Sequence, residues 1–169
     1  MPEHTVFVSL GSNSRPEENL AAAVRLLGAR CRVLAVSAVY RTAPQGDTRQ
    51  ADFLNMAVRL QTPLNAADFK TQVIGDIERQ LGRVRDPLNK NAPRTIDLDI
   101  SLWDDAAFDY GEKPWHVPEP DILRFAHVAV PLAELAPDYV HPETGQTLAQ
   151  IAAGLDSSGV QREARVIAP

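Results

Sequence analysis

The apolar residues at the start of the chain change from a continuous run to a helical spacing. Residues 5–10 are apolar, β-branched and aromatic, and residues 11–13 interrupt them with glycine, serine and asparagine, so a strand that enters a loop is expected. Over residues 16–27 apolar side chains recur every three or four positions, beginning with proline and two glutamates and ending before Gly28. This pattern predicts a helix that ends near Gly28.

The same two patterns repeat further along the chain. Residues 32–40 and 53–60 are extended apolar segments separated by turn residues, so we expect neighbouring antiparallel strands. Residues 64–81 are the longest amphipathic stretch and predict a helix. Its buried stripe is Phe69, Val73, Ile77 and Leu81. The apolar pattern stops over residues 82–94, which predicts a loop, and it resumes over residues 95–103 as a strand.

This order of elements predicts the fold class. Strand, helix, strand, strand, helix and strand indicate an α+β fold with a ferredoxin-like split βαββαβ core, in which two helices pack on one face of an antiparallel sheet. We expect a C-terminal extension to wrap this core, with helices over residues 121–125, 130–136 and 148–155. A length of 169 residues fits one domain spanning residues 1–169. Because folds of this kind serve many functions, function must come from the site.

Composition and charge exclude several classes of protein. Hydrophobic residues make up 44% and charged residues 23% of the chain, which is typical of a globular protein rather than a disordered one. A net charge of −5 gives no general attraction to nucleic acid or to an anionic membrane. Cys31 is the single cysteine, so an internal disulfide and a multi-cysteine metal site are excluded. The sequence has no signal peptide or membrane-spanning run, and we expect a cytoplasmic protein that acts as a monomer.

Two acidic residues interrupt the last predicted strand. Asp97 and Asp99 alternate with apolar residues, so their side chains point to one face, roughly 6–7 Å apart along the strand. Two carboxylates at this separation repel each other, and Mg²⁺, which prefers oxygen ligands and shares its shell with substrate phosphates, would relieve the repulsion. The alternative is a solvated outer strand face, which the apolar character of the strand disfavours.

Basic residues gather in the loop that precedes these carboxylates. Arg83, Arg85, Lys90 and Arg94 lie there. Guanidinium groups bind phosphate oxygens and stabilise the charge of a moving phosphoryl group, so the loop indicates nucleotide chemistry beside the metal site. Taken without the aspartates, the same residues would fit an ordinary solvated loop.

Several short motifs resemble those of the hydroxymethyl-dihydropterin pyrophosphokinase family. They are residues 10–13 (LGSN), 40–44 (YRTAP), 53–58 (FLNMAV), 81–85 (LGRVR) with Glu78, and 93–100 (PRTIDLDI). The resemblance runs from about residue 6 to residue 137 in the same order and spacing, and the last motif is highly specific. It implies an ATP-dependent diphosphotransferase that moves pyrophosphate from ATP to 6-hydroxymethyl-7,8-dihydropterin in folate synthesis and releases AMP.

The resemblance also implies roles for individual residues. Asp97 and Asp99 would hold two Mg²⁺ ions that bridge the ATP phosphates, and Arg83 and Arg94 would grip phosphates during catalysis. The nucleotide would further contact Glu78, Arg85, Arg94 and Ile100. The pterin would contact Gly11, Thr42, Ala43, Phe53, Asn55 and His127, with Phe53 stacked on one face of its ring.

The chain departs from the family pattern after residue 117. Glu119 follows Val117 and Pro118 where family members usually have a histidine, and His127 stands where a second stacking aromatic is expected. An imidazole can stack on a flat heterocycle, although a packed core histidine would fit the same position, and Phe125 is then the next candidate for stacking. Two alternatives follow: a paralogue that acts on a related pterin, or a weakly catalytic pterin- or nucleotide-binding regulator. The full set of Asp97, Asp99 and arginines argues against the regulator.

Overall fold

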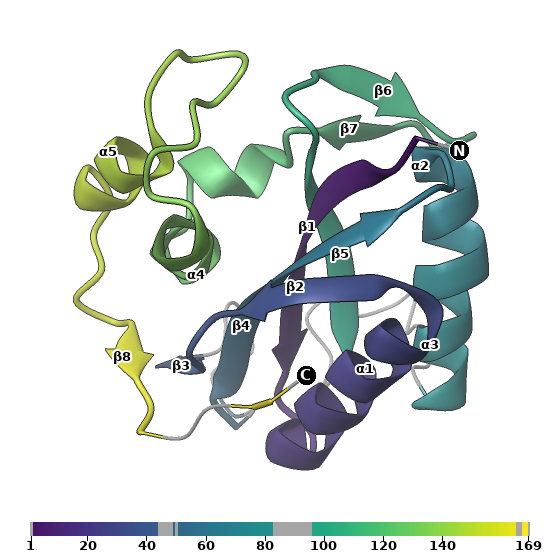
Figure 1. Cartoon of the computed structure of the whole chain (residues 1–169). Coiled ribbons are helices and arrows are strands. Elements are labelled where there is room, and N and C mark those ends of the chain that lie inside the picture. The colour runs from purple at the N-terminus through teal and green to yellow at the C-terminus, as the bar shows by residue number, and fades with distance from the viewer. Residues whose placement is uncertain (1, 44–48, 50, 83–95, 165–166, 169) are drawn as a thin grey trace.

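The core of the molecule is an antiparallel sheet. The computed structural model describes residues 2–43, 49, 51–82, 96–164 and 167–168. In these residues the sheet has the strand order β5-β1-β4-β3-β8, and β2 also pairs with β4 (Figure 1). Its strands are β1 (His4–Ser12), β2 (Arg32–Val36), β3 (Tyr40–Thr42), β4 (Phe53–Thr62), β5 (Asp97–Trp103) and β8 (Gln161–Arg162). A mixed fold of helices and antiparallel sheet is therefore confirmed.

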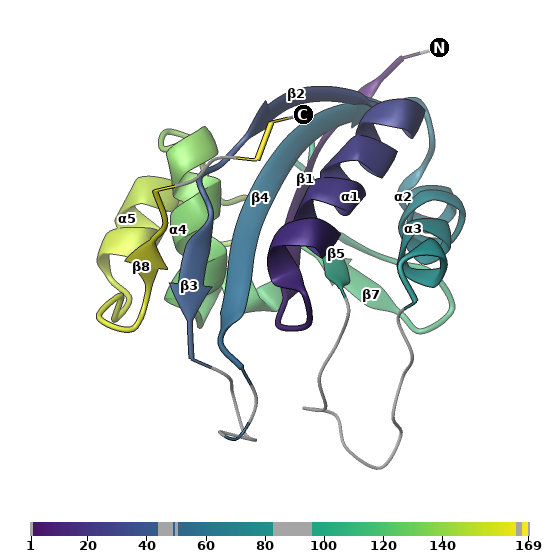
Figure 2. The same cartoon turned by 90° about the horizontal axis from the view of Figure 1, so that it is seen from below.

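Helices cover both faces of this sheet. Side chains alternate along β1, so Val6, Val8 and Leu10 point to the same face of the sheet. There they pack in a core that α1 (Pro16–Arg30) and α3 (Gly75–Gln80) cover. Phe7 points the other way, into a second core with Leu132 of α4 (Ala126–Leu135). Figure 2 shows α1 and α3 on one side of the sheet, and α4 with α5 (Leu148–Ala153) on the other. The C-terminal extension thus supplies a third layer.

The helix predicted over residues 64–81 contains a widened turn. It begins as α2 (Ala66–Asp68), capped by the Asn65 side chain, continues as a π-helix η1 (Phe69–Ile74), and ends as α3. Within η1 the Gly75 N–H donates to the Lys70 carbonyl, five residues back. Such a turn adds a residue without disturbing the buried stripe much, since Phe69, Val73 and Ile77 are all buried as predicted. The predicted helix is therefore present, and the widened turn within it was not predicted.

The strand predicted over residues 32–40 is two strands. The chain leaves the sheet after β2, where the Ser37 side chain replaces backbone hydrogen bonds between strands. Its Oγ accepts a hydrogen bond from the Ala57 N–H and donates one to the Ala38 carbonyl, both at 2.8 Å. Glu134 of α4 accepts from the Ala38 N–H at 2.8 Å. The hydrophobic pattern of the sequence does not indicate any of these three hydrogen bonds. Gly28 likewise lies inside α1, which continues to Arg30 rather than ending there.

The C-terminal third differs most from expectation. A 3-10 helix η2 (Pro120–Leu123) replaces the α-helix expected over residues 121–125, α4 begins four residues before its predicted start at 130, and α5 ends at Ala153. The hairpin of β6 (Phe108–Tyr110) and β7 (Trp115–Val117) was not predicted, because its strands are short and its prolines indicate only turns. In the part of the chain that the structure describes, no helix is long and apolar enough to cross a membrane.

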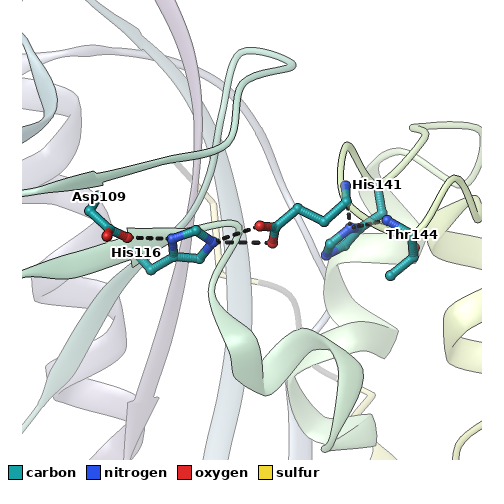
Figure 3. Close-up of polar contacts among 5 residues, drawn as sticks. Asp109, His116, His141 and Thr144 are labelled. Carbon is teal, nitrogen blue, oxygen red and sulfur yellow. Dashed lines mark hydrogen bonds and ion pairs between the residues drawn. The ribbon is translucent and has the colours of Figure 1, made fainter.

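A histidine ties the β6–β7 hairpin to the loop that precedes α5. Nδ1 of His116 lies 2.6 Å from Asp109 Oδ1, and Nε2 lies 3.0 Å from Glu143 Oε2 (Figure 3). His141, which is buried, accepts at Nδ1 from the Glu143 and Thr144 N–H groups and so fixes that loop. Hydrogen bonds to Asp109 and then Glu143 raise the pKa of His116, so the protonated ring is favoured between the two carboxylates.

Candidate active site

A cavity of about 320 Å³ opens at the end of the sheet where β1, β3, β4 and β5 meet residues 121–128. Every residue predicted to contact the pterin lines it: Gly11, Thr42, Ala43, Phe53, Asn55 and His127. Asp97 and Asp99 line it too. Residues from four separate strands thus meet at one place, and the cavity is the candidate active site.

The two carboxylates face the cavity as strand alternation requires. Ile96, Leu98 and Ile100 are buried in the core at 0%, 0% and 2% exposure. On the opposite face Asp99 keeps 48% of its side-chain exposure because it borders the open cavity. The cavity walls nevertheless displace enough water to raise the pKa of Asp99 to about 7, with the like charge of Asp97 adding to the effect and Lys70 opposing it. The cavity therefore disfavours the ionised form of Asp99, and a bound cation would favour it.

The outer edge of β5 is held from the adjoining helix. Glu78 accepts a hydrogen bond from the Leu98 N–H at 3.2 Å, and Lys70 Nζ lies 3.5 Å from the Leu98 carbonyl oxygen. Glu78 was predicted to help arrange the nucleotide site; the structure places its carboxylate against the strand that carries both aspartates. Lys70 was missed by the sequence analysis, since its approach to β5 depends on the widened turn of η1.

A hydrogen bond across β3 and β4 orients the polar wall of the cavity. Asn55 Nδ2 donates to Thr42 Oγ1 at 2.9 Å, and both side chains are buried. Gly11, predicted to allow a close approach, does so for Asn55: a Cβ at position 11 would lie 2.9 Å from Asn55 Oδ1. Any larger residue there would push the amide out of place.

Aromatic rings supply the apolar wall. His127 stacks on Phe125 with 5.3 Å between ring centroids and 25° between planes, and both rings line the cavity, as does Phe53. Burial lowers the pKa of His127, so the neutral imidazole is favoured. Phe125 lies between η2 and α4, and His127 lies in the first turn of α4, so the two rings stack where the chain enters that helix.

Other predicted residues fall away from the cavity or outside the described part of the chain. Ile100 points its side chain into the core, so a contact with the nucleotide would have to use its backbone. Arg83, Arg85 and Arg94 lie outside the described residues. Glu119 is half-buried and caps η2, accepting from the Asp121 N–H at 3.3 Å.

Two further polar residues of the cavity wall were not predicted. Ser9 shares a 2.6 Å hydrogen bond with Ser101, and Asp121 lies 3.7 Å from the Arg124 guanidinium. Short hydroxyl residues within an apolar strand and a lone aspartate after a proline carry no distinctive sequence signal.

Among the described residues, no group of three or more histidine, cysteine or acidic side chains is arranged to hold a metal ion. A divalent cation here would rely on two carboxylates and on its substrates.

An aromatic pocket beside paired carboxylates on an antiparallel sheet is the arrangement of a group-transfer enzyme for a flat ring and a phosphate donor. Residues 7–137 match the model of the family described as 7,8-dihydro-6-hydroxymethylpterin-pyrophosphokinase, and the chain belongs to this family. It is therefore a pyrophosphokinase, as predicted.

Curated relatives agree with this assignment. The chain is 40% identical over 159 residues to 2-amino-4-hydroxy-6-hydroxymethyldihydropteridine pyrophosphokinase of Methylorubrum extorquens, covering 92% of this chain and 96% of the relative. It is 36% identical over 160 residues to the protein of the same name from Pseudomonas aeruginosa, covering 93% and 95% of the two chains.

A solved structure agrees on the fold. The Plasmodium falciparum HPPK-DHPS A437G structure with STZ-DHP superposes with a TM-score of 0.74 at 13% identity. The superposition covers 90% of this chain but 45% of the longer Plasmodium chain.

Proposed function

We propose that the cavity binds 6-hydroxymethyl-7,8-dihydropterin and that the chain transfers pyrophosphate to it from ATP, releasing AMP, in folate biosynthesis. Family membership supports the reaction, and one structural observation supports the place: the six residues predicted to contact the pterin and the two predicted to hold metal line a single cavity. The hydroxymethyl oxygen attacks the β-phosphorus of ATP. The bond from that phosphorus to the oxygen bridging the α-phosphate breaks, and AMP leaves with that oxygen.

In this proposal the pterin lies between the aromatic walls. Phe53 covers one face of the ring and the His127–Phe125 pair the other, while Asn55 hydrogen-bonds the polar edge and the backbone at Thr42 and Ala43 completes the contact. The hydrogen bond that Asn55 Nδ2 donates to Thr42 Oγ1 orients the amide before the substrate arrives. A preset amide and a neutral His127 reduce the cost of ordering the site on binding.

We further propose that Asp97 and Asp99 hold magnesium together with the ATP phosphates. The residues present fit such a site, because Mg²⁺ commonly takes one or two carboxylates and completes its shell with water and phosphate oxygens. Burial first, and the neighbouring Asp97 second, raise the pKa of Asp99, and a bound cation would favour its ionised form. When bound, the metal would supply charge stabilisation for the transferred group.

Arginines are proposed to complete the nucleotide site. Arg83 and Arg94 would bind the transferred phosphates and Arg85 would assist, since guanidinium groups form paired hydrogen bonds with phosphate oxygens. Glu78 would act indirectly, by holding Leu98 between the two aspartates. Asp99 or water would accept the hydroxyl proton.

We also infer that the core is the ferredoxin-like split βαββαβ arrangement. The order β5-β1-β4 with β2 beside β4, and α1 and α3 sharing one core, support this. A single domain, a monomeric state and a cytoplasmic location complete the proposal.

Product analysis tests the proposed reaction. With Mg-ATP and 6-hydroxymethyl-7,8-dihydropterin, chromatography should show AMP and the pterin diphosphate in equal amounts. A dihydropterin with a methyl group in place of the hydroxymethyl group should give no AMP. Release of ADP in place of AMP, or AMP release that ignores the pterin, would contradict the proposal.

A further inference from the structure

The Lys70 ammonium lies 3.9 Å from Asp99, and no sequence motif predicts a cation at this position. It belongs to the π-helix η1, whose widened turn brings position 70 to the β5 side of the helix. Only 13% of the side chain is exposed. A lysine this deeply buried needs partners for its ammonium group.

The ammonium group has three partners. Nζ lies 3.9 Å from Asp99 Oδ1, 3.5 Å from the Leu98 carbonyl oxygen and 5.4 Å from the centre of the Trp115 ring. The carboxylate and the carbonyl attract the positive charge, and the ring face adds a cation–π contact. Lys70 is not among the residues that line the cavity, so it approaches Asp99 from behind.

The Trp115 ring is itself held in place. At Gly111 the backbone has φ +77, and a Cβ there would lie 2.5 Å from the Trp115 ring. Tyr110 packs against the tryptophan with 5.8 Å between ring centroids. The indole is thus a fixed support for the ammonium group rather than a mobile surface ring.

The charge of Lys70 reaches beyond Asp99. Glu119 also lies near enough for the charge of Lys70 to act on it. One ammonium therefore attracts both Asp99 and Glu119, and it offsets part of the repulsion between Asp99 and its neighbour Asp97.

We propose that Lys70 is a tethered cation of the active site, a positioning residue that offsets the charge of Asp97 and Asp99 while no divalent cation is bound. This inference rests on the proposed metal role of the two aspartates. A divalent cation arriving alone would meet the positive charge of Lys70 a few ångströms away, which weakens its binding. ATP phosphates add negative charge that removes this disadvantage, so the metal is expected to enter with the nucleotide.

Calorimetry with Mn²⁺ on the nucleotide-free protein tests this inference. Lys70→Met keeps the length of the side chain and removes its charge, so Mn²⁺ affinity should rise by about tenfold, less at high salt because the repulsion is screened. Lys70→Arg should bind Mn²⁺ like the wild type. Arg25→Met, at an exposed position of α1, removes one positive charge elsewhere and should leave the affinity unchanged.

Melting temperature gives a readout independent of the first. Without metal, Lys70→Met should melt below the wild type, because the carboxylates lose their counter-charge, and saturating Mn²⁺ should restore most of the difference. A purely structural lysine would lower the melting temperature equally with and without metal, and that outcome would overturn the inference.

Mn²⁺ binding by the two variants also distinguishes failure of the Lys70 role from failure of the proposed metal site. If Asp99→Ala abolishes Mn²⁺ binding while Lys70→Met leaves it unchanged or weaker, the tethered-cation role is overturned and the metal site stands. If neither the wild type nor Lys70→Met binds Mn²⁺, with or without ATP, the proposed metal role is overturned as well.

Discussion

The Glu78 carboxylate accepts a hydrogen bond from the backbone N–H of Leu98 at 3.2 Å, midway between Asp97 and Asp99. β5 ends the sheet order, so among the described residues no further strand of this sheet pairs with its outer side. A side chain from α3 therefore fixes the position of the strand that carries the carboxylates. This contact links the helical layer to the chemistry in the cavity.

Removal of this contact should impair catalysis more than folding. We expect Glu78→Ala to lower kcat by about tenfold or more, because a charge-assisted hydrogen bond of about 1.5–3 kcal/mol that fixes β5 is lost. Glu78→Gln keeps an acceptor oxygen and should fall between Ala and wild type. Steady-state kinetics with melting temperatures measure both effects, and equal kcat values in all three proteins would contradict a positioning role.

The stacked pair of Phe125 and His127 is expected to govern pterin affinity. His127→Phe should keep or improve binding, whereas His127→Ala should weaken it by roughly 1–3 kcal/mol, the scale of one lost stacked ring. Phe125→Ala should act in the same direction because it removes the ring that supports His127. Calorimetry with pterin and a non-hydrolysable ATP analogue measures these values.

A core histidine predicts a different result for the same variants. His127→Ala would then lower the melting temperature through lost packing and leave pterin affinity unchanged. That pattern would remove His127 from the binding site.

The His116 clamp should make stability depend on pH in a defined direction. Its pKa is raised in the folded protein, so its contribution is fully present below the unfolded value of about 6.5 and is lost as pH rises through the folded value. His116→Gln should therefore melt further below the wild type at about pH 6 than at about pH 9. The side chain is 33% exposed, so the effect should stay under about 1 kcal/mol.

Comparison of each variant with the wild type at the same pH isolates His116 from the other histidines. Asp109 and Glu143 face its ring, and His141 lies close enough for their charges to interact. Glu143→Gln should reproduce the loss near pH 6 in part. A melting difference for His116→Gln that grows with rising pH would contradict the clamp.

The arginines of residues 83–95 should act during the chemical step. Arg83→Ala and Arg94→Ala are expected to lower kcat more than they weaken ATP binding, since their phosphate contacts would be completed in the transition state. Kinetics together with ATP titration separate the two effects. A change confined to the KM for ATP in both variants would contradict this role.

Much of the fold was predictable because its signals are local. The runs of β1, β4 and β5, the helical spacing of α1 and the stripe of Phe69, Val73 and Ile77 are all written in hydrophobic periodicity. The break at Ser37 and the turn of η1 were missed because each depends on hydrogen bonds that periodicity does not record. The β6–β7 hairpin was missed because its strands are only three residues long and the prolines near them indicate turns.

Some residues of the candidate site were likewise predictable from the sequence and others were not. Asp97, Asp99, Asn55 and Phe53 stand in motifs, and alternation along their strands predicts which face they share. Lys70 and Asp121 lie outside any motif. Their approach to the site results from tertiary packing, and one sequence cannot reveal it.

AMP release by aspartate variants tests whether the carboxylate pair is required for pyrophosphate transfer. With Mg-ATP and 6-hydroxymethyl-7,8-dihydropterin, Asp97→Ala and Asp99→Ala should each abolish AMP release and remain folded. Asp97→Ala should melt near or above the wild type because a like-charge repulsion is relieved, whereas Asp99→Ala should melt lower because Lys70 loses its carboxylate partner. Asp138→Ala, at an exposed position after α4, should remain fully active. Near-normal AMP release by either Asp97→Ala or Asp99→Ala would contradict the account.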